Sequence, residues 1–414
     1  MRDAITSFLR LCLRIFFRRI EIEGWERVPR VAPVVFAVNH PNGLVDPLFV
    51  LSYAGRPVSF LAKAPLFRYP FIGWFVRKLE TIPVYRKQDH TSGSNEETFG
   101  KSREVLRRGG SIAIFPEGTT HDDPRLRELK TGAARIALGA GVGEVFVVPT
   151  GIYYTAKHVF RSAALVVFGA PLRVASTGET DPEEVDALTM AIDAGLDAVT
   201  VQADSHAALD LIARAEDIVT ANDEQPLAAE LELRRRFVEG YHHLRARDPG
   251  RLERLEQAIA QFEAELRSAR IDVYALRPRI SGKRLLRVVV LLPLALLGAT
   301  VSYPTYRLIG ILATRFAKGE GAVTATIKFL AALALYPLTY LAIAIAVGMR
   351  WGWIAGVLTG LALPFVGYVA LRVFEDIDDI IGDLRGLVAN REELLAKRRA
   401  IREEIVAIER EIGR

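Results

Sequence analysis

The chain has 414 residues, of which 50% are hydrophobic and 25% charged, and its formal net charge is +5. This composition excludes a disordered or collagen-like chain, and the length predicts two or three domains. The mild basic excess fits an anionic membrane surface or phosphorylated substrates, and it is too small to indicate a nucleic-acid partner. A single cysteine, Cys12, excludes an intrachain disulfide, a CxxC redox pair and a cysteine-rich zinc site.

Residues 1–20 predict a basic amphipathic helix. Arg10, Arg14 and Arg18 recur every four residues among leucines, isoleucines and phenylalanines. These arginines interrupt the apolar stretch that a secretory signal would need. We therefore expect the helix to lie in a membrane interface or, as an equal alternative, to pack on its own domain.

Residues 21–180 predict an α/β domain with a largely buried sheet. Short apolar runs alternate with helical stretches, which is the pattern of a layered α/β fold. Strands are expected at residues 20–24, 33–40, 58–63, 111–118, 144–154 and 164–171. Helices are expected at residues 98–108 and 129–140.

Residues 181–285 predict a charged helical region. Asp181-Pro182 is a helix start signal, and Asp248-Pro249-Gly250 interrupts the helical pattern further on. This region contains no catalytic motif, so the pattern favours a scaffold over a helical hairpin that covers a substrate groove.

Residues 286–372 predict a transmembrane region of two or three helices. About 20 apolar residues suffice to cross a bilayer core, and residues 288–306, 329–349 and 351–371 are uncharged. The first stretch contains Pro293 and Pro304, so it is either a span or a broken, partly interfacial helix. Only Arg350 separates the other two stretches, which implies a tight hairpin; buried core helices are the alternative. Residues 373–414 predict a charged C-terminal helix that is solvated or self-associates loosely.

The first motif whose residues could take part in catalysis is NHPNGLVD at residues 39–46, directly after an apolar strand. A histidine at a strand end can form a dyad with a carboxylate a few residues further on. The histidine then takes a proton from an attacking hydroxyl, and the carboxylate stabilises the resulting imidazolium. The alternative is ordinary turn chemistry around Pro-Asn-Gly.

The second motif is FPEGTT at residues 115–120, which also ends an apolar strand. It offers a carboxylate, backbone amides beside a glycine and two hydroxyls, and Arg125, Arg127 and Lys130 follow it. Glycine allows the backbone to approach a ligand closely, and basic side chains neutralise phosphate. The alternative is a plain strand-to-loop turn.

Two further segments combine aromatic and basic residues. KAPLFRYPFIGWFVRKLETIPVYR at residues 63–86 suits a membrane interface or an acyl chain, and the alternative is a surface helix followed by a short strand. GIYY at residues 151–154 leads to Lys157, His158 and Arg161.

In this order, the segments resemble the motif blocks of the phospholipid/glycerol acyltransferase family, within the lysophospholipid acyltransferase superfamily. The blocks are NH…D, GWFVRKLETIPVYR, FPEGTT with LKTGAARIALGAG, and VVPTGIYY, and they cover about residues 20–175. The resemblance implies an α/β fold with a mixed sheet flanked by helices. It also implies transfer of a fatty acyl group from acyl-CoA or acyl carrier protein to a glycerol hydroxyl. No cofactor and no metal are expected, because the thioester is already activated and deprotonation, proximity and oxyanion stabilisation suffice.

The resemblance also implies roles for single residues. His40 corresponds to the general base and Asp46 to its orienting partner. The residues that correspond to a binding site for the glycerol phosphate are Arg86, Glu117, Gly118 and Thr119, with Lys130 and Arg161 as further phosphate ligands.

One departure from the family pattern is the spacing of the dyad, with five residues between His40 and Asp46 in place of the usual four. This spacing resembles fungal-type glycerol-3-phosphate and dihydroxyacetone-phosphate acyltransferases, as do FRS at residues 160–162 and a C-terminal membrane region. We therefore expect a membrane-bound O-acyltransferase of phospholipid biosynthesis, acting on glycerol 3-phosphate or 1-acylglycerol 3-phosphate. Membrane lipids are its expected partners, and its catalytic domain is expected on the cytoplasmic side. The alternative is a catalytically inactive membrane protein that binds lipid or serves as a scaffold.

Overall fold

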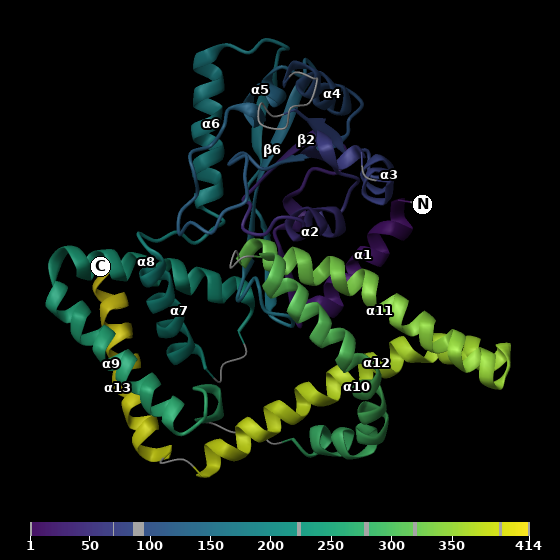
Figure 1. Cartoon of the computed structure of the whole chain (residues 1–414). Helices are drawn as coiled ribbons and strands as arrows, with labels where there is room; N and C mark the ends of the chain where they lie inside the picture. Colours follow the sequence, from purple (N-terminus) through teal and green to yellow (C-terminus); the bar gives the residue numbers. More distant parts are fainter. Residues whose placement is uncertain are drawn as a thin grey trace. The chain divides into compact units, whose positions relative to one another are not determined.

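The structure is a computed structural model that describes residues 2–68, 70–85, 95–221, 225–276, 281–317, 321–388 and 391–412. The chain forms two compact units. The first comprises Met1–Asp204 with Glu320–Thr326, and the second comprises Ser205–Gly319 with Ile327–Arg414. Figure 1 labels the helices and strands in chain order, and the two units are described separately below.

A mixed sheet of eight strands forms the centre of the first unit. Its order is β1-β7-β6-β2-β5-β3-β4, and β8 pairs with β6. β2 runs parallel to β5 and β6, whereas β6 runs antiparallel to β7 and β8. The strands are β1 (Arg19–Glu23), β2 (Val34–Val38), β3 (Ser59–Lys63), β4 (Ile82–Val84), β5 (Ser111–Ile114), β6 (Gly143–Tyr154), β7 (Ala163–Phe168) and β8 (Leu172–Ser176). The predicted mixed α/β fold is therefore confirmed. β8 was not predicted, and β4 was expected only as the short strand of the alternative for residues 63–86.

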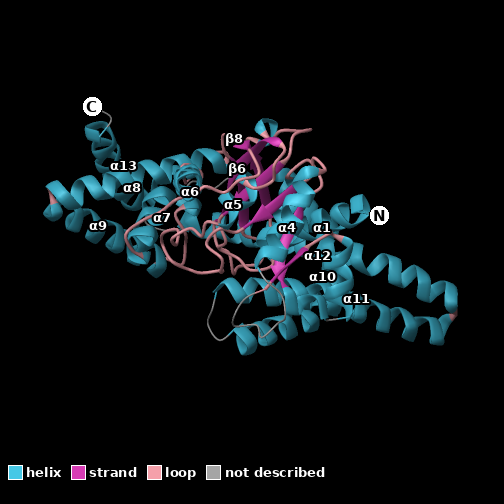
Figure 2. Ribbon diagram, turned by 90° about the horizontal axis from the view of Figure 1, so that it is seen from above, coloured by secondary structure: helices cyan, strands magenta, loops and turns pink. Residues whose placement is uncertain are grey.

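Helices pack on both faces of this sheet, as Figure 2 shows for the magenta strands among the cyan helices. The first unit includes the helices α1 (Arg2–Phe16), α2 (Val45–Tyr53), α3 (Pro70–Lys78), α4 (Asn95–Arg107), α5 (Gly132–Leu138) and α6 (Pro182–Asp197). Alternate residues of a strand point to opposite faces. Val35 of β2 thus belongs to a core with the apolar residues of α5 and α6, whereas Phe36 contacts Phe168 on the other face.

The N-terminal helix α1 carries two apolar surfaces. Leu9 and Leu13 are buried within the first unit, and α1 packs against α2. Phe8 and Leu11 are 51% and 56% exposed on the same helix as the exposed Arg10. One side of α1 therefore contributes to the core, while the other presents apolar and basic side chains to the surroundings.

The second unit contains a bundle of four helices: α7 (His206–Thr220), α8 (Leu227–Arg247), α9 (Pro249–Ser268) and α13 (Arg391–Ile412). The predicted break at Asp248 is confirmed, because its carboxylate accepts a hydrogen bond of 2.9 Å from the Arg251 N–H and caps α9. The expectation that the C-terminal helix is solvated is wrong. Its residues Leu394, Ile401 and Ile405 are buried in the bundle, because the apolar positions of α13 recur at helical spacing.

Among the residues that the structure describes, three helices are long and apolar enough to cross a membrane: α10 (Gly282–Ala317), α11 (Gly321–Trp351) and α12 (Trp353–Val388). α10 is continuous through Pro293 and Pro304. α11 and α12 are joined at Gly352, whose φ of 96° favours glycine and permits the tight hairpin that the sequence predicts. Near the start of α10, Arg287 forms an ion pair of 3.2 Å with Asp376 of α12.

Candidate active site

The NHPNGLVD segment begins where β2 ends, at the buried centre of the sheet. The Asn39 side chain fixes this point to β6, since its Oδ1 accepts from the Ile152 N–H at 2.7 Å and its Nδ2 donates to the Ile152 carbonyl at 3.1 Å. The chain then turns and enters α2, whose first turn carries Asp46. The central strand therefore sets where His40 lies, and α2 sets where Asp46 lies.

His40 and Asp46 are in direct contact. His40 Nδ1 lies 2.9 Å from Asp46 Oδ2, so the five intervening residues close the dyad. The imidazole also stacks on the Phe115 ring, with the ring centroids 3.9 Å apart and an interplanar angle of 17°. The His40 side chain is 14% exposed and that of Asp46 is 0% exposed. With Nδ1 engaged by the carboxylate, Nε2 is the ring nitrogen available for proton transfer with a substrate.

The Asp46 carboxylate has further hydrogen-bond donors in addition to His40. Its Oδ2 also accepts from the Asn42 N–H at 2.7 Å, and its Oδ1 accepts from the Tyr154 hydroxyl at 2.6 Å. Burial raises the Asp46 pKa above its usual range, while the hydrogen bonds from His40, Tyr154 and Asn42 act in the opposite direction. Burial likewise raises the pKa of Tyr154 well above normal, so this residue remains a neutral donor to the carboxylate.

We expect the Tyr154→Phe variant to lose activity selectively at acid pH. Removing the hydroxyl removes a hydrogen bond that lowers the Asp46 pKa, so the carboxyl stays protonated to a higher pH. The acid limb of the kcat/KM profile should move to higher pH, with a loss of roughly fivefold along that limb and a smaller loss on its alkaline side. Tyr153→Phe, which deletes the same atom from the preceding residue, is the control. An unchanged acid limb in Tyr154→Phe contradicts this assignment.

The FPEGTT segment contacts the dyad through Glu117. This side chain is 3% exposed, and its Oε1 accepts from the His40 backbone N–H at 3.0 Å. Its Oε2 accepts from the Arg127 N–H at 3.1 Å and also contacts His121 Nε2. Glu117 therefore joins the loop after β5 to the backbone of the histidine loop.

Gly118 and Lys130 lie directly against each other in this loop. Gly118 has a φ of 75°, and a Cβ at this position would lie 2.4 Å from Lys130 Nζ. The Lys130 backbone N–H donates to the Pro116 carbonyl at 2.8 Å, which holds the lysine beside the FPEGTT turn. Lys130 and Thr119 are both exposed, and the Thr119 hydroxyl lies 3.4 Å from the Thr120 carbonyl.

One residue with a predicted phosphate role, Arg161, is not part of this arrangement. The guanidinium of Arg161 donates to the carbonyls of Arg14, Ile15 and Phe17 at 3.0–3.1 Å, so it caps the C-terminal end of α1. Arg86 lies outside the described residues. The structure thus groups His40, Asp46, Glu117, Gly118 and Lys130, with Thr119 beside them.

Sequence reasoning missed several residues that hold the site together. Tyr154 ends the GIYY segment and His121 directly follows FPEGTT, but neither was assigned a role. Lys157 Nζ donates to the Pro41 carbonyl at 3.3 Å and pairs with Asp122, so it links the histidine loop to the segment after FPEGTT. The available signal was position alone, because each of these residues lies in or just after a motif block.

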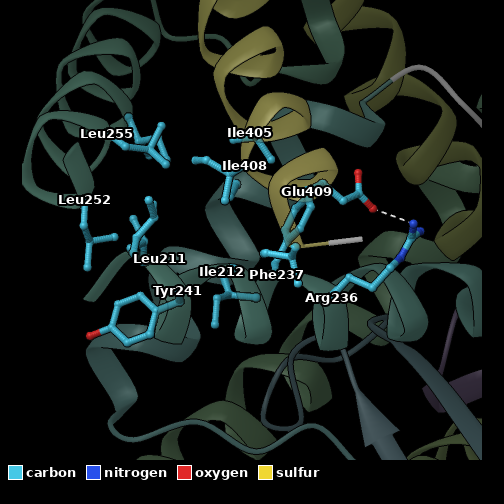
Figure 3. A pocket seen from close by; sticks show the side chains of 15 residues that line it. Leu211, Ile212, Arg236, Phe237, Tyr241, Leu252, Leu255, Ile405, Ile408 and Glu409 are labelled. Carbon is cyan, nitrogen blue, oxygen red and sulfur yellow. Dashed lines mark ion pairs between the residues drawn. The ribbon is translucent and has the colours of Figure 1, made fainter. Parts of the chain in front are cut away.

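A separate cavity lies in the four-helix bundle of the second unit (Figure 3). Apolar side chains of α7, α8, α9 and α13 line it, including Leu211, Phe237 and Ile408, and Arg236 pairs with Glu409 at its edge. Its volume is about 50 Å³. Ligand pockets usually measure about 300–1,000 Å³, so we place the candidate active site at the dyad and not here.

The comparisons with known proteins concern the part of the chain that holds the sheet, the histidine-aspartate pair and the Glu117 loop, and also the helical part that follows it. A family profile described as Acyltransferase matches residues 19–153. A second profile, described as the glycerol-3-phosphate acyltransferase 2 C-terminal domain, matches residues 218–413. The resemblance to the acyltransferase family and to fungal-type glycerol-3-phosphate acyltransferases is therefore confirmed.

Similar proteins carry names from the same class. An uncharacterized acyltransferase of Schizosaccharomyces pombe is 26% identical over 64% of this chain and 53% of its own length. Glycerol-3-phosphate O-acyltransferase 1 of Saccharomyces cerevisiae is 26% identical over 61% of this chain and 46% of its own length. The chloroplastic 1-acyl-sn-glycerol-3-phosphate acyltransferase LPAT1 of Arabidopsis thaliana is 33% identical over 34% of this chain and 38% of its own length. The matches thus span about half or less of the length of these relatives.

Proposed function

We propose that the chain is a membrane-bound O-acyltransferase of phospholipid biosynthesis. It transfers a fatty acyl group from acyl-CoA or acyl carrier protein to glycerol 3-phosphate or 1-acylglycerol 3-phosphate. The observation that carries this proposal is the 2.9 Å contact between His40 Nδ1 and the buried Asp46 carboxylate, in a domain that matches the acyltransferase profile. The names of the relatives support both acceptors.

In the proposed reaction, His40 Nε2 takes the proton of the acceptor hydroxyl while the oxygen of that hydroxyl attacks the thioester carbonyl carbon. The C–O ester bond forms, the C–S bond breaks, and the thiolate leaves with the proton that the imidazolium returns. Asp46 stabilises the imidazolium and holds its orientation. The substrate hydroxyl is itself the nucleophile, so the reaction needs no covalent acyl-enzyme intermediate.

The acceptor phosphate is proposed to bind next to the FPEGTT turn. Lys130 offers an ammonium there, and Thr119 offers a hydroxyl next to the positive-φ backbone of Gly118. Such a combination of a cation and open backbone suits a phosphate. Arg86 is retained in this proposal as a further phosphate ligand, whereas Glu117 acts by holding the His40 backbone.

The remaining parts are proposed to keep the enzyme at the membrane. α1 lies in the interface with its exposed apolar and basic side chains, and the apolar helices α10, α11 and α12 supply the spans. The catalytic domain is proposed on the cytoplasmic side, with residues 181–285 as a helical scaffold. Residues 286–372 then form the transmembrane region of two or three helices, and residues 373–414 the charged C-terminal part that follows it.

An acceptor panel tests this function. The purified full chain in phospholipid vesicles is supplied with labelled acyl-CoA or acyl carrier protein. Separate assays contain glycerol 3-phosphate, dihydroxyacetone phosphate, 1-acylglycerol 3-phosphate or lysophosphatidylcholine. We expect ester formation with at least one glycerol phosphate. Absence of turnover with every acceptor and both donors supports the inactive lipid-binding or scaffold protein instead.

A further inference from the structure

The helix that carries Asp46 begins without a cap of its own. The residue at its N-cap position is Leu44, whose side chain cannot accept a hydrogen bond from the first amides. Helix starts leave several N–H groups without partners inside the helix, and a side-chain oxygen normally satisfies one of them. An uncapped start is costly here, because the position of Asp46 in the first turn defines its contact with His40.

The missing acceptor comes from a distant part of the chain. The Leu44 N–H donates to Thr326 Oγ1 at 3.2 Å, across 282 positions in the sequence. Thr326 therefore takes the part that the N3 side chain plays in a capping box, where a side-chain oxygen accepts from the N–H of the N-cap residue.

Thr326 stands near the start of α11, one of the helices apolar enough to cross a membrane. The short segment Glu320–Thr326 forms part of the catalytic unit, whereas α11 from Ile327 onward belongs to the second unit. Ala325, next to Thr326, is 0% exposed, so this end of α11 is packed and not merely nearby. The first residues of an apolar helix thus contact the loop between His40 and Asp46.

We propose that Thr326 is a positioning residue, which aligns the His40–Asp46 pair by capping α2 from the membrane helix α11. Loss of the cap frees the first turn of α2, and Asp46 then no longer lies at a fixed distance from His40 Nδ1. Displacements of about 1 Å in a catalytic group lower turnover by up to about 100-fold. The dyad is therefore complete only when the start of α11 is docked. This inference rests on the proposed acyl transfer for its kinetic consequences, but not for the contact itself.

The kinetic test compares three variants in vesicles. Thr326→Val keeps the shape of the side chain and removes the hydroxyl, and we expect kcat to fall about 10- to 100-fold with little change in the KM of the acceptor. Thr326→Ser restores a hydroxyl and should recover most of kcat. Thr359→Val is the matched control, since the Thr359 hydroxyl bonds to Ala355 within its own helix. Wild-type turnover in Thr326→Val, or equal losses in the valine and serine variants, would overturn the proposal.

A cross-linking experiment tests the contact between Leu44 and Thr326 without measuring turnover. Cys12 is the one natural cysteine, so a Cys12→Ser background carries only the introduced pair. Leu44→Cys with Thr326→Cys should form a disulfide rapidly in vesicles. Leu44→Cys with Thr324→Cys, displaced by two positions and about 200° around the helix, should not. Lack of a cross-link between positions 44 and 326 overturns the proposal even if the acceptor panel finds no activity, so the two failures are distinguishable.

Discussion

The His40→Ala variant should lose about 100- to 10,000-fold in kcat, the range that a positioned general base contributes. His40 is the residue whose Nδ1 contacts Asp46, so removing the imidazole removes the proton acceptor and leaves the acceptor hydroxyl protonated. Initial rates with the acceptor that the panel identifies, at saturating donor, measure the effect. Added imidazole should return part of the rate, because the variant leaves a space against the Phe115 ring.

Folding must be preserved for this result to bear on mechanism. His40 lies in a loop at a strand end and its side chain is partly exposed, so its loss should change the thermal midpoint little. His243→Ala makes the same chemical change in the helical unit and should retain wild-type turnover. A loss of less than about tenfold in His40→Ala, with the fold intact, contradicts its role as the base.

The Asp46→Asn variant should lose about 1,000-fold in kcat while remaining at least as stable as the wild type. The amide has the shape of the carboxylate, and its oxygen can accept from the His40 ring and the Asn42 N–H in the same way. The negative charge that stabilises the imidazolium is lost, and comparable substitutions in histidine-carboxylate pairs cost up to about 10,000-fold. Steady-state kinetics and thermal unfolding of the same samples separate the two effects.

The difference in stability between the Asp46→Asn variant and the wild type should depend on pH. Burial raises the folded-state pKa of Asp46, so between the unfolded and folded pKa values the folded state binds more protons than the unfolded state. The contribution of this group to stability therefore falls as the pH rises through that window. The side-chain amide of the Asp46→Asn variant does not ionise, so the thermal midpoint of the variant relative to wild type should increase with pH. A variant that becomes steadily less stable than wild type as pH rises contradicts the assignment.

The elements that sequence patterns predicted best are those that depend on local order. The apolar runs at residues 33–40 and 144–154 contain β2 and β6. α6 begins at the predicted Asp181-Pro182 signal, and the Asp181 carboxylate accepts a hydrogen bond from the Glu183 N–H there. Alternation and capping act over a few residues, so the sequence displays them directly. α2 was not predicted, because it begins at an apolar residue without a cap signal of its own.

The candidate site was predictable only in part for a related reason. His40 and Asp46 lie close in sequence, and the strand before them indicates a loop at a sheet end. Glu117 was expected to contact the substrate, but in the structure its two oxygens hold the His40 backbone and the following loop. Arg161 was expected near a phosphate, yet its guanidinium is engaged at the end of α1. The type of a residue shows which hydrogen bonds and ion pairs its side chain can make. It does not show which partner the fold places beside that side chain.

The sequence by itself determined the class of fold, the order of the motif blocks and the presence of long apolar helices. These depend on residue type and on spacing along the chain. The tertiary structure alone decided that Tyr154 and Thr326 reach the loop of His40 and Asp46, from 108 and 282 positions away. Such contacts follow from the pairing of β2 with β6 and from the docking of the start of α11. Long-range packing sets both arrangements, and local sequence patterns do not encode it.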